Sequence, residues 1–546
     1  MKALILPLLA ALAALCPALP GAAQPVDRSP VPMRDPGSTL APDWHRGVFM
    51  EIFVRAWKDS DGDGIGDLRG LTQSLPYLKA LGIRGLWLMP ITANADGDHG
   101  YATTDFRAIA PEYGTLADFD ALIAAAHAAG IGVIMDYVIN HSAAQHPWFV
   151  ASRSDPAHPL RDWYVWSEPA PRGWDIWGKN PWYHAAAQPW DYKGDPKTLP
   201  PAAPGATQHY FGTFGPHMPD FNLRNPAVWQ YHEDSLRFWL NRGLDGFRLD
   251  AVPHMVETDA KEWNDQPESR RLTKRLQDLI RSYRHRWAVC EATAEPQVYA
   301  REDVCGAAFA FGYVQHYVAA ARGDAASVQA LVQPHPRRSD RLATMVSNHD
   351  IFAGQRLWDQ VGGDEARYRM AAAGYLLQPG TPFVYYGEEV GMGGLPGLKG
   401  DLPVRGPMSW SAEGGFSSGK PFRATAPNAR THNAAAQRQA PDSLWHFYRE
   451  MIGLRNAHPS IARGSWVHGR ADGMVAQWQR EADGERTLVL VNHGTSGATV
   501  EAEALPPGAR LRAAWPGWAA PARADGTGRA TLHLAPQSVR VYTVGP

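Results

Sequence analysis

The sequence predicts an α/β protein whose core is a (β/α)₈ barrel, with a subdomain inserted after the third strand and a C-terminal antiparallel β domain. Three observations favour this fold class. Short apolar strand-like runs alternate with segments of helical spacing, one long segment interrupts the alternation, and short β-like runs fill the C-terminus. A chain of 546 residues is long enough to bury a large core and to form several domains.

The alternation predicts eight strands. A strand at 48–54 precedes a helix at 71–81, a strand at 85–89 precedes a helix at 116–129, and a third strand covers 131–137. Residues 142–219 are rich in Trp, Pro, Gly and Tyr, and a segment this long is better explained as an inserted subdomain than as a loop. A helix at 227–240 resumes the pattern, which continues with strands near 244–250, 287–292, 307–312, 342–347 and 382–386. Such a series is typical of a TIM barrel.

These boundaries divide the chain into successive parts. Residues 1–23 carry Lys2, an apolar run and small residues before a cleavage point near Ala23, which predicts a secretory signal peptide. The remaining parts are an irregular segment at 24–45, the catalytic barrel at 46–141 and 220–456, subdomain B at 142–219, and the β domain at 457–546.

The composition excludes some classes of partner. The net charge of −2 gives no electrostatic footprint for nucleic acid. No apolar run after the signal reaches the ~18 residues of a membrane-spanning helix. We therefore expect a secreted or periplasmic protein that is free of the membrane after cleavage, with a monomer as the expected state. Cys290 and Cys305 remain after cleavage, and two buried thiols are expected there, although an oxidising compartment permits a bridge.

Charged residues stand at the ends of several predicted strands. Arg248 and Asp250 interrupt an apolar run and share one face of a strand, where burial is costly unless each is paired. An isolated pair of this kind is usually structural. Three other apolar runs also end in acids, at Asp136, Glu291 and Asp350. Because barrel enzymes place their chemistry at the carboxyl ends of the strands, these acids are expected to converge on one rim.

The motifs around these acids resemble those of the α-amylase family of retaining glycoside hydrolases. In the family's order, the chain carries DYVINH at 136–141, GFRLD at 246–250, Glu291, and NHD at 348–350. Supporting segments are GY at 100–101, MPDFN at 218–222 and GTPFVYYGE at 380–388. The resemblance runs from about Val48 to the C-terminus. The MPDFN segment is similar to the version found between the oligo-1,6-glucosidase and neopullulanase branches, a group with secreted bacterial α-amylases.

The resemblance implies a role for each matching residue. Asp250 would be the nucleophile, Glu291 the general acid/base, and Asp350 the residue that stabilises the transition state. Retention needs two carboxyl groups ~5–5.5 Å apart, one ionised and one protonated. Arg248 is expected to keep Asp250 ionised by charge pairing. The residues implied to contact the sugar are Tyr101, His141, Arg248, His254 and His349, and Asp136 would support them without touching it.

A second motif suggests a calcium site. Asp59, Asp61, Asp63 and Asp67 occupy positions 1, 3, 5 and 9 of an EF-hand-like loop, and the carbonyl of Ile65 takes position 7. Position 12 is Gly70, so this is not an EF-hand, and the spacing alone fits a solvated turn equally well. Related enzymes bind Ca²⁺ at a matching loop, which implies Ca²⁺ as the cofactor. A second ion near Asn140 is a further expectation from the resemblance.

Three functions remain open. The leading hypothesis is an α-amylase that hydrolyses α-1,4 bonds in starch or maltooligosaccharides by double displacement. Ala251 favours it, and Ala102 replaces an acid that closes the pocket of glucosidases, which favours an open cleft. The alternative is an α-glucosidase or a trehalose-forming transglycosylase or isomerase on short α-glucosides, because the Val252–Pro253 pair is similar to trehalose-forming relatives. The third is a catalytically inactive glucan-binding relative, which typically lacks the carboxylates present here.

Overall fold

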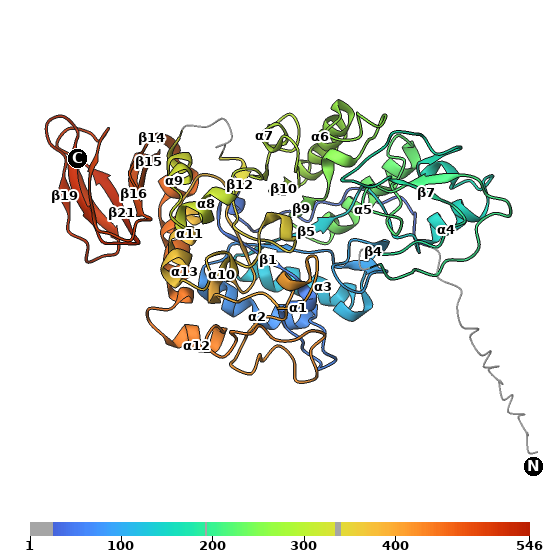
Figure 1. Cartoon of the computed structure of the whole chain (residues 1–546), viewed down its shortest axis with the longest axis horizontal. Coiled ribbons are helices and arrows are strands. Elements are labelled where there is room, and N and C mark those ends of the chain that lie inside the picture. The colour runs from blue at the N-terminus through green and yellow to red at the C-terminus, as the bar shows by residue number, and fades with distance from the viewer. Residues whose placement is uncertain (1–25, 192–193, 334–339) are drawn as a thin grey trace, which may run out of the picture.

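The computed structural model describes residues 26–191, 194–333 and 340–546 (Figure 1). The predicted signal peptide at 1–23 lies outside these residues. From Val26 to Asp43 the described chain is irregular, and it runs beside α5, where the side chain of Asn241 bonds the backbone of Pro32 and Arg34. No helix in the described ranges is both long and apolar enough to cross a membrane.

Eight parallel strands form a barrel, which confirms the predicted fold class. Their order is β12-β11-β10-β9-β5-β2-β1-β13, and a parallel bridge between Thr344 and Pro382 joins the two outermost strands. The strands are β1 (Phe49–Ile52), β2 (Gly85–Leu88), β5 (Gly132–Tyr137), β9 (Gly246–Leu249), β10 (Trp287–Cys290), β11 (Ala308–Phe309), β12 (Leu342–Ala343) and β13 (Phe383–Tyr385). Several of them are shorter than the apolar runs predict, because the chain leaves the sheet where the polar rim begins.

Aromatic rings fill the barrel interior. Phe383 packs against Phe49 at 4.8 Å between ring centroids and against Phe309 at 5.1 Å, and Phe309 also contacts Trp87 at 5.3 Å. Gly85 faces Phe49 in register, and a Cβ at Gly85 would lie 2.4 Å from that ring. The interior is therefore a packed core rather than a channel, as in other barrels of this type.

Helices surround the barrel (Figure 1). The Asp67 carboxylate caps α2 by accepting a hydrogen bond from Gly70 N, and Gly82 ends that helix in the left-handed conformation at φ +94°. The helices of the barrel and its loops are α1 (Val54–Trp57), α2 (Leu68–Leu81), α3 (Leu116–Ala128), α5 (Pro226–Asn241), α6 (Pro267–Arg281), α7 (Pro296–Tyr299), α8 (Gln315–Ala321), α9 (Ala325–Val332), α10 (Leu357–Gln360), α11 (Glu365–Leu376), α12 (Ala434–Gln439) and α13 (Leu444–Ala457).

Two excursions leave the carboxyl end of the barrel. The hairpin of β3 (Thr92–Asn94) and β4 (Thr103–Ile109) follows β2. After β5 the chain forms α4 (Pro147–Ser154) and a small sheet of β6 (Trp166–Ser167), β8 (His209–Phe211) and β7 (Trp182–His184). An antiparallel bridge between His141 and Asp220 joins the two ends of this insertion. It lies at the opposite end of the molecule from the C-terminal strands in Figure 1.

The C-terminal strands form the expected antiparallel β domain. One sheet has the order β14-β15-β16-β21-β18-β19, and β17 pairs with β20. The first strand begins at Ser465 rather than at 457, because α13 continues to Ala457 and α14 (Pro459–Arg463) follows it. The strands are β14 (Ser465–Asp472), β15 (Val475–Ala482), β16 (Glu485–Asn492), β17 (Ala498–Ala502), β18 (Arg510–Trp515), β19 (Ala522–Arg523), β20 (Ala530–Leu534) and β21 (Ser538–Gly545).

Cys290 and Cys305 form a disulfide bond. The expectation of two separate thiols is therefore wrong. The sequence separation is 15 residues, but α7 turns the chain back so that the segment before β11 lies beside the end of β10. Cys290 is paired in register with Ala308 on β11, which brings the two cysteine Cα atoms to 6.3 Å.

Candidate active site

Arg248 is the centre of the polar rim. It lies on β9 with its side chain almost fully buried, and its Cα is in register with that of Asp136 on the neighbouring strand β5. Its guanidinium bonds Asp136 at 2.8 Å, contacts Asp250 directly, and bonds Glu291 at 2.9 Å. One cation thus brings together three acids that are far apart in the sequence.

Asp250 and Glu291 lie at the ends of adjacent strands. Asp250 follows β9 and Glu291 follows β10, and the backbone N–H of Ala251 donates a hydrogen bond of 3.1 Å to Glu291 Oε2. Ala251 adopts a left-handed conformation at φ +48°, which turns the chain away from the strand immediately after Asp250. Both carboxyl groups therefore project from one rim and share one guanidinium.

Burial raises the pKa of Asp250, Arg248 opposes the rise, and the nearby acids Glu291 and Asp136 add to it. Burial likewise raises the pKa of Asp136 against the opposing effect of Arg248. The expectation that Arg248 keeps Asp250 ionised is not met in the free site, because burial raises the pKa of Asp250 more than Arg248 lowers it. That a proton resides on Glu291 stays a prediction.

His349 links two further acids. Its Nδ1 lies 2.6 Å from Glu51 on β1, and its Nε2 lies 3.2 Å from Asp350. Burial disfavours the charged imidazole, but Asp350 and Glu51 outweigh that effect and raise the pKa of His349 to about 10. The ring is therefore an imidazolium at neutral pH. Burial tends to raise the pKa of Asp350, yet His349 and Arg405 lower it overall, so Asp350 is ionised.

Tyr101 connects this group to the first one. Its hydroxyl donates to Asp136 at 2.8 Å and lies 2.7 Å from His349 Nε2, and its ring stacks on the His349 ring with centroids 5.4 Å apart. Because His349 is charged and donates its proton, the Tyr101 hydroxyl accepts from it and donates to Asp136. A continuous network of hydrogen bonds therefore runs from Glu51 to Glu291.

Arg405 stands beside Asp350. Its guanidinium lies 2.9 Å from Asp350, 3.3 Å from Asp401 and 3.5 Å from Asp98, and Arg423 bonds Asp98 at 2.5 Å. Arg405 is almost fully buried and also donates to the backbone carbonyl of His349. A network of charged side chains thus closes this side of the site.

Ala102 is buried in a small apolar cluster with Ala143 and Met218 and does not line the cavity. That the absence of an acid at this position opens the cleft stays a prediction. Asp98, three residues before Tyr101, supplies the acid near the pocket wall instead, through its ion pair with Arg405.

The rim opens into a cavity of about 520 Å³. Tyr101, Asp250, Glu291 and Asp350 line it, together with His141 and His254. Burial lowers the pKa of His141 to about 3 and that of His254 to about 4, so both rings are neutral. The buried atoms His141 Nε2 and His254 Nδ1 have no hydrogen-bond partner within the described parts of the chain, which leaves them available to a sugar hydroxyl.

Aromatic side chains form the mouth of the cavity. Trp177 from the insertion is 61% exposed, and Phe352 after β12 is 57% exposed. Trp177 packs edge-on against His254 at 5.4 Å and lies 5.8 Å from Phe214. Trp177 has a positive φ of 52° within the turn bridged by Ile176 and Lys179. This mouth suits the apolar faces of a sugar ring.

The structure also identifies residues that the sequence reasoning missed, namely Glu51, Asp98, Arg405, Trp177, Phe214 and Phe352. Glu51 had a readable signal, because it is an acid inside an apolar strand-like run, like Asp250. Arg405 lies in a loop without periodic pattern, so nothing in the sequence marked it.

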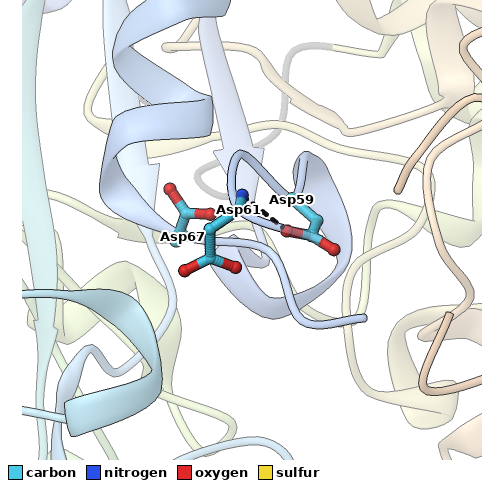
Figure 2. A group of neighbouring side chains, drawn as sticks. All are labelled: Asp59, Asp61 and Asp67. Atoms are coloured by element: carbon cyan, nitrogen blue, oxygen red, sulfur yellow. Dashed lines mark hydrogen bonds between the residues drawn. The ribbon is translucent and has the colours of Figure 1, made fainter. Parts of the chain in front are cut away.

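Three acids of the predicted calcium loop converge. One carboxylate oxygen from each of Asp59, Asp61 and Asp67 lies within 4.8 Å of the others (Figure 2). Asp63 is not in this group, and its carboxylate accepts a hydrogen bond from Ile65 N instead. Backbone N–H groups of Asp61, Gly62 and Gly64 already donate to the Asp59 carboxylate, which holds the loop in shape. Three converging carboxylates match the oxygen ligands that Ca²⁺ prefers.

Asn140 lies elsewhere. Its amide donates to the buried Asp220 carboxylate at 3.0 Å, and burial raises the pKa of Asp220 to about 7. Within the described ranges, the group at 59–67 is the one set of three or more His, Cys, Asp or Glu side chains that could hold a metal. A second ion at Asn140 stays a prediction.

Comparisons with known proteins agree with this site. The family model described as "Alpha amylase, catalytic domain" matches residues 51–464. Trehalose synthase/amylase TreS of Mycobacterium tuberculosis is 33% identical over 519 residues, which cover 84% of each chain. A probable alpha-glucosidase of Rhizobium meliloti is 30% identical and covers 85% of this chain and 92% of its own. The alpha-glucosyl transfer enzyme XgtA has a crystal structure with a TM-score of 0.77 and 28% identity, covering 93% of this chain and all of its own.

The charge on His349 predicts a pH-dependent contribution to stability. Because the pKa of His349 is raised from 6.5 to about 10, this contribution is fully present below pH 6.5 and is lost as the pH rises through about 10. We expect His349→Gln to lower the melting temperature by several degrees near pH 6, because Glu51 loses its buried partner. Calorimetry of both proteins from pH 6 to 10 should show the difference shrinking. His533→Gln, on the exposed face of β20, is the control; a difference that stays constant across this range contradicts the assignment.

Proposed function

This chain belongs to the α-amylase family and acts on O-glycosyl bonds of α-glucosides, and from that premise we propose that it is a glucosyl-transferring isomerase of short α-glucosides. Maltose is the proposed substrate, trehalose the main product, and hydrolysis to glucose the competing reaction. This proposal replaces starch hydrolysis as the leading hypothesis.

The main support for this proposal is the inner wall of the cavity, which is formed by charged side chains around Arg405. Arg405, bonded to Asp350, Asp401 and Asp98, lines the cavity beside the reacting acids, where an endo-acting enzyme needs room for further sugar units. A cavity of about 520 Å³ suits a disaccharide better than a long chain. The similarity to relatives named trehalose synthase and alpha-glucosidase supports the same choice.

The residues around the cavity support a double displacement. Asp250 attacks the anomeric carbon while Glu291 donates a proton to the glycosidic oxygen, so that glucose leaves and a glucosyl ester forms on Asp250. The positive charge that develops on the sugar stabilises ionised Asp250, which offsets the effect of burial on its pKa. Glu291 then takes a proton from the anomeric hydroxyl of the retained glucose, whose oxygen attacks the ester and gives trehalose. Water in the same position gives hydrolysis.

The other side chains position the sugar. Tyr101 presents its ring to the cavity, and its hydroxyl is fixed between His349 and Asp136. Asp350, held by His349 and Arg405, accepts hydrogen bonds from sugar hydroxyls. Because these groups are already fixed by the network, little reorganisation is needed as charge develops.

We also propose that Ca²⁺ binds the loop at 59–67. Asp59, Asp61 and Asp67 would hold the ion, which would fix the start of α2 through its N-cap residue Asp67. The loop packs tightly, because a Cβ at Gly64 would lie 2.2 Å from the Lys420 carbonyl. The ion would therefore stabilise the fold at a distance from the chemistry.

Export is the third proposal, and the disulfide between Cys290 and Cys305 supports it, since such bonds persist in oxidising compartments. The signal at 1–23 should then be removed. Expression in the native host, fractionation and N-terminal sequencing should give a mature chain outside the cytoplasm that begins near residue 24. A cytoplasmic chain that still begins at Met1 contradicts this proposal.

Product analysis tests the reaction. With maltose, the wild-type chain should give trehalose with a smaller amount of glucose, and soluble starch should release few reducing ends. Asp250→Asn should lower the rate at least about 1,000-fold, because the nucleophile is lost. Asp278→Asn, on the exposed side of α6, should leave the rate unchanged. Glucose as the sole product would indicate an α-glucosidase, and rapid release of internal starch fragments would indicate an α-amylase.

Thermal unfolding tests the calcium site. Removing Ca²⁺ with a chelator should lower the melting temperature of the wild-type chain, and adding Ca²⁺ should restore it. Asp61→Ala should abolish this response, whereas Asp63→Ala, an equally exposed acid outside the cluster, should retain it. Loss of the response in both variants would place Asp63 among the ligands, as the spacing predicts. A melting temperature that is independent of Ca²⁺ contradicts the site.

A further inference from the structure

A second cavity lies between the barrel helices and the C-terminal β domain. It has a volume of about 310 Å³, and we call it the junction groove. Helix α11 supplies Arg369, helix α13 supplies Phe447 and Glu450, the end of β18 and its loop supply Trp515 and Trp518, and β21 supplies Arg540. None of these residues lines the active-site cavity. The C-terminal domain lies at the far end of the molecule from the inserted subdomain in Figure 1.

Trp518 is the most exposed large apolar side chain within the described ranges, at 77%. The Arg540 guanidinium lies 4.5 Å from the centroid of its ring. A cation at this distance stabilises an aromatic ring in a fixed orientation. Most of the indole faces water and is free to contact a ligand.

Arg540 is unusual in its lack of polar partners. The residue is 9% exposed, yet no hydrogen bond or ion pair to its guanidinium occurs within the described parts of the chain. Its N–H donors are therefore free to bond acceptors in the groove. A ligand that offers oxygen acceptors would pair with them.

The floor of the groove is rigid. Trp515 packs edge-on against Phe447, with centroids 5.8 Å apart, and its Nε1 donates to Glu450 at 2.8 Å. The guanidinium of Arg369 lies 5.3 Å from the centroid of the Phe447 ring and donates to the backbone carbonyl of Asp442. These contacts hold the floor in place before any ligand binds, which lowers the entropic cost of binding.

The charges of the groove select a neutral ligand. Arg369 and Arg540 are balanced by the acids Asp442 and Glu450, and His446 is the remaining titratable group that lines it. A strongly anionic ligand would meet two carboxylates, and a cationic ligand would meet two guanidinium groups. A neutral molecule with both hydroxyl donors and acceptors, and with flat apolar faces, fits this combination of exposed indole and mixed polar groups.

We propose that the junction groove is a second binding site, specific for neutral α-linked oligosaccharides. A pyranose ring stacks on the free surface of Trp518, and its hydroxyls accept hydrogen bonds from Arg540. Because the groove shares no residue with the active-site cavity, it holds a longer glucan without presenting it to Asp250. The hydrolysis of such glucans supplies the short α-glucosides on which the enzyme acts, so the site keeps the enzyme near its substrate source. The proposal takes its ligand class from the α-glucoside activity and does not depend on trehalose being the product.

Electrophoresis in native gels that contain glycogen tests the site, with the full chain carrying Asp250→Asn to prevent turnover. This parent should migrate more slowly in glycogen than in a gel without it. Adding Trp518→Ala should weaken the apparent affinity for glycogen about tenfold, as expected for the loss of a stacking surface. Trp190→Ala, which removes another exposed tryptophan (48%) outside the groove, should leave the retardation unchanged.

Two further measurements separate this proposal from its alternatives. In the otherwise wild-type chain, Trp518→Ala should convert maltose at the wild-type rate and retain the melting temperature, which excludes misfolding. If no variant acts on maltose while glycogen still retards the parent, the proposed reaction fails and the groove stands. Equal retardation of the parent and the Trp518→Ala variant, or no retardation of the parent, overturns the groove. A parent that sediments as a dimer, with a monomeric Trp518→Ala variant, also overturns it, because a second copy then occupies the surface.

Discussion

The site depends on one buried cation, Arg248. Its side chain is almost fully withdrawn from water, where an unpaired charge is not tolerated, so the acids around it are a condition of folding as well as of chemistry. The backbone register between β5 and β9 places position 136 beside position 248, so Asp136 lies next to Arg248. Asp250 at the end of β9 and Glu291 at the end of β10 contact the same guanidinium. Burial raises the pKa values of Asp250 and Asp136 in spite of this cation, and a retaining mechanism requires a protonated and an ionised carboxyl side by side.

The second buried cation of the site is His349. It is held between Glu51 and Asp350, and these two acids keep the imidazole charged in spite of its burial. Asp350 is thereby ionised, whereas burial raises the pKa values of Asp136 and Asp250 beside Arg248. The Tyr101 hydroxyl, bonded to both His349 and Asp136, joins the two groups into one network. The cavity is therefore lined by carboxyl groups whose pKa values are shifted in opposite directions, lowered at Asp350 and raised at Asp250.

The sequence predicts the barrel and the cluster of acids at its rim well, because a charged residue at the end of an apolar strand is both rare and local. It predicts the surroundings poorly. Arg405 acts through Asp98 and Asp401, and such contacts between loops leave no periodic pattern. Ala102 follows Tyr101 in the sequence, but its side chain packs into an apolar cluster and not into the cavity. The disulfide was missed for a related reason, since the turn at α7 that returns Cys305 to Cys290 depends on tertiary packing.

The choice between hydrolysis and transfer depends on the loops around the barrel and not on the acids at its rim. In the proposed mechanism both reactions share a glucosyl ester on Asp250 and a proton on Glu291, so the residues of the family motifs cannot favour either one. The outcome is set by whether water or a sugar hydroxyl occupies the position opposite the ester, and a difference of about 1.4 kcal/mol between them changes the product ratio tenfold. The aromatic side chains Trp177, Phe214 and Phe352 line the cavity and offer apolar surface to a sugar but few groups that bind water. They come from the inserted subdomain and from the loop after β12, the parts of the chain that the barrel leaves free to vary. In this proposal the barrel sets the reaction class, and the aromatic mouth selects the acceptor that completes it.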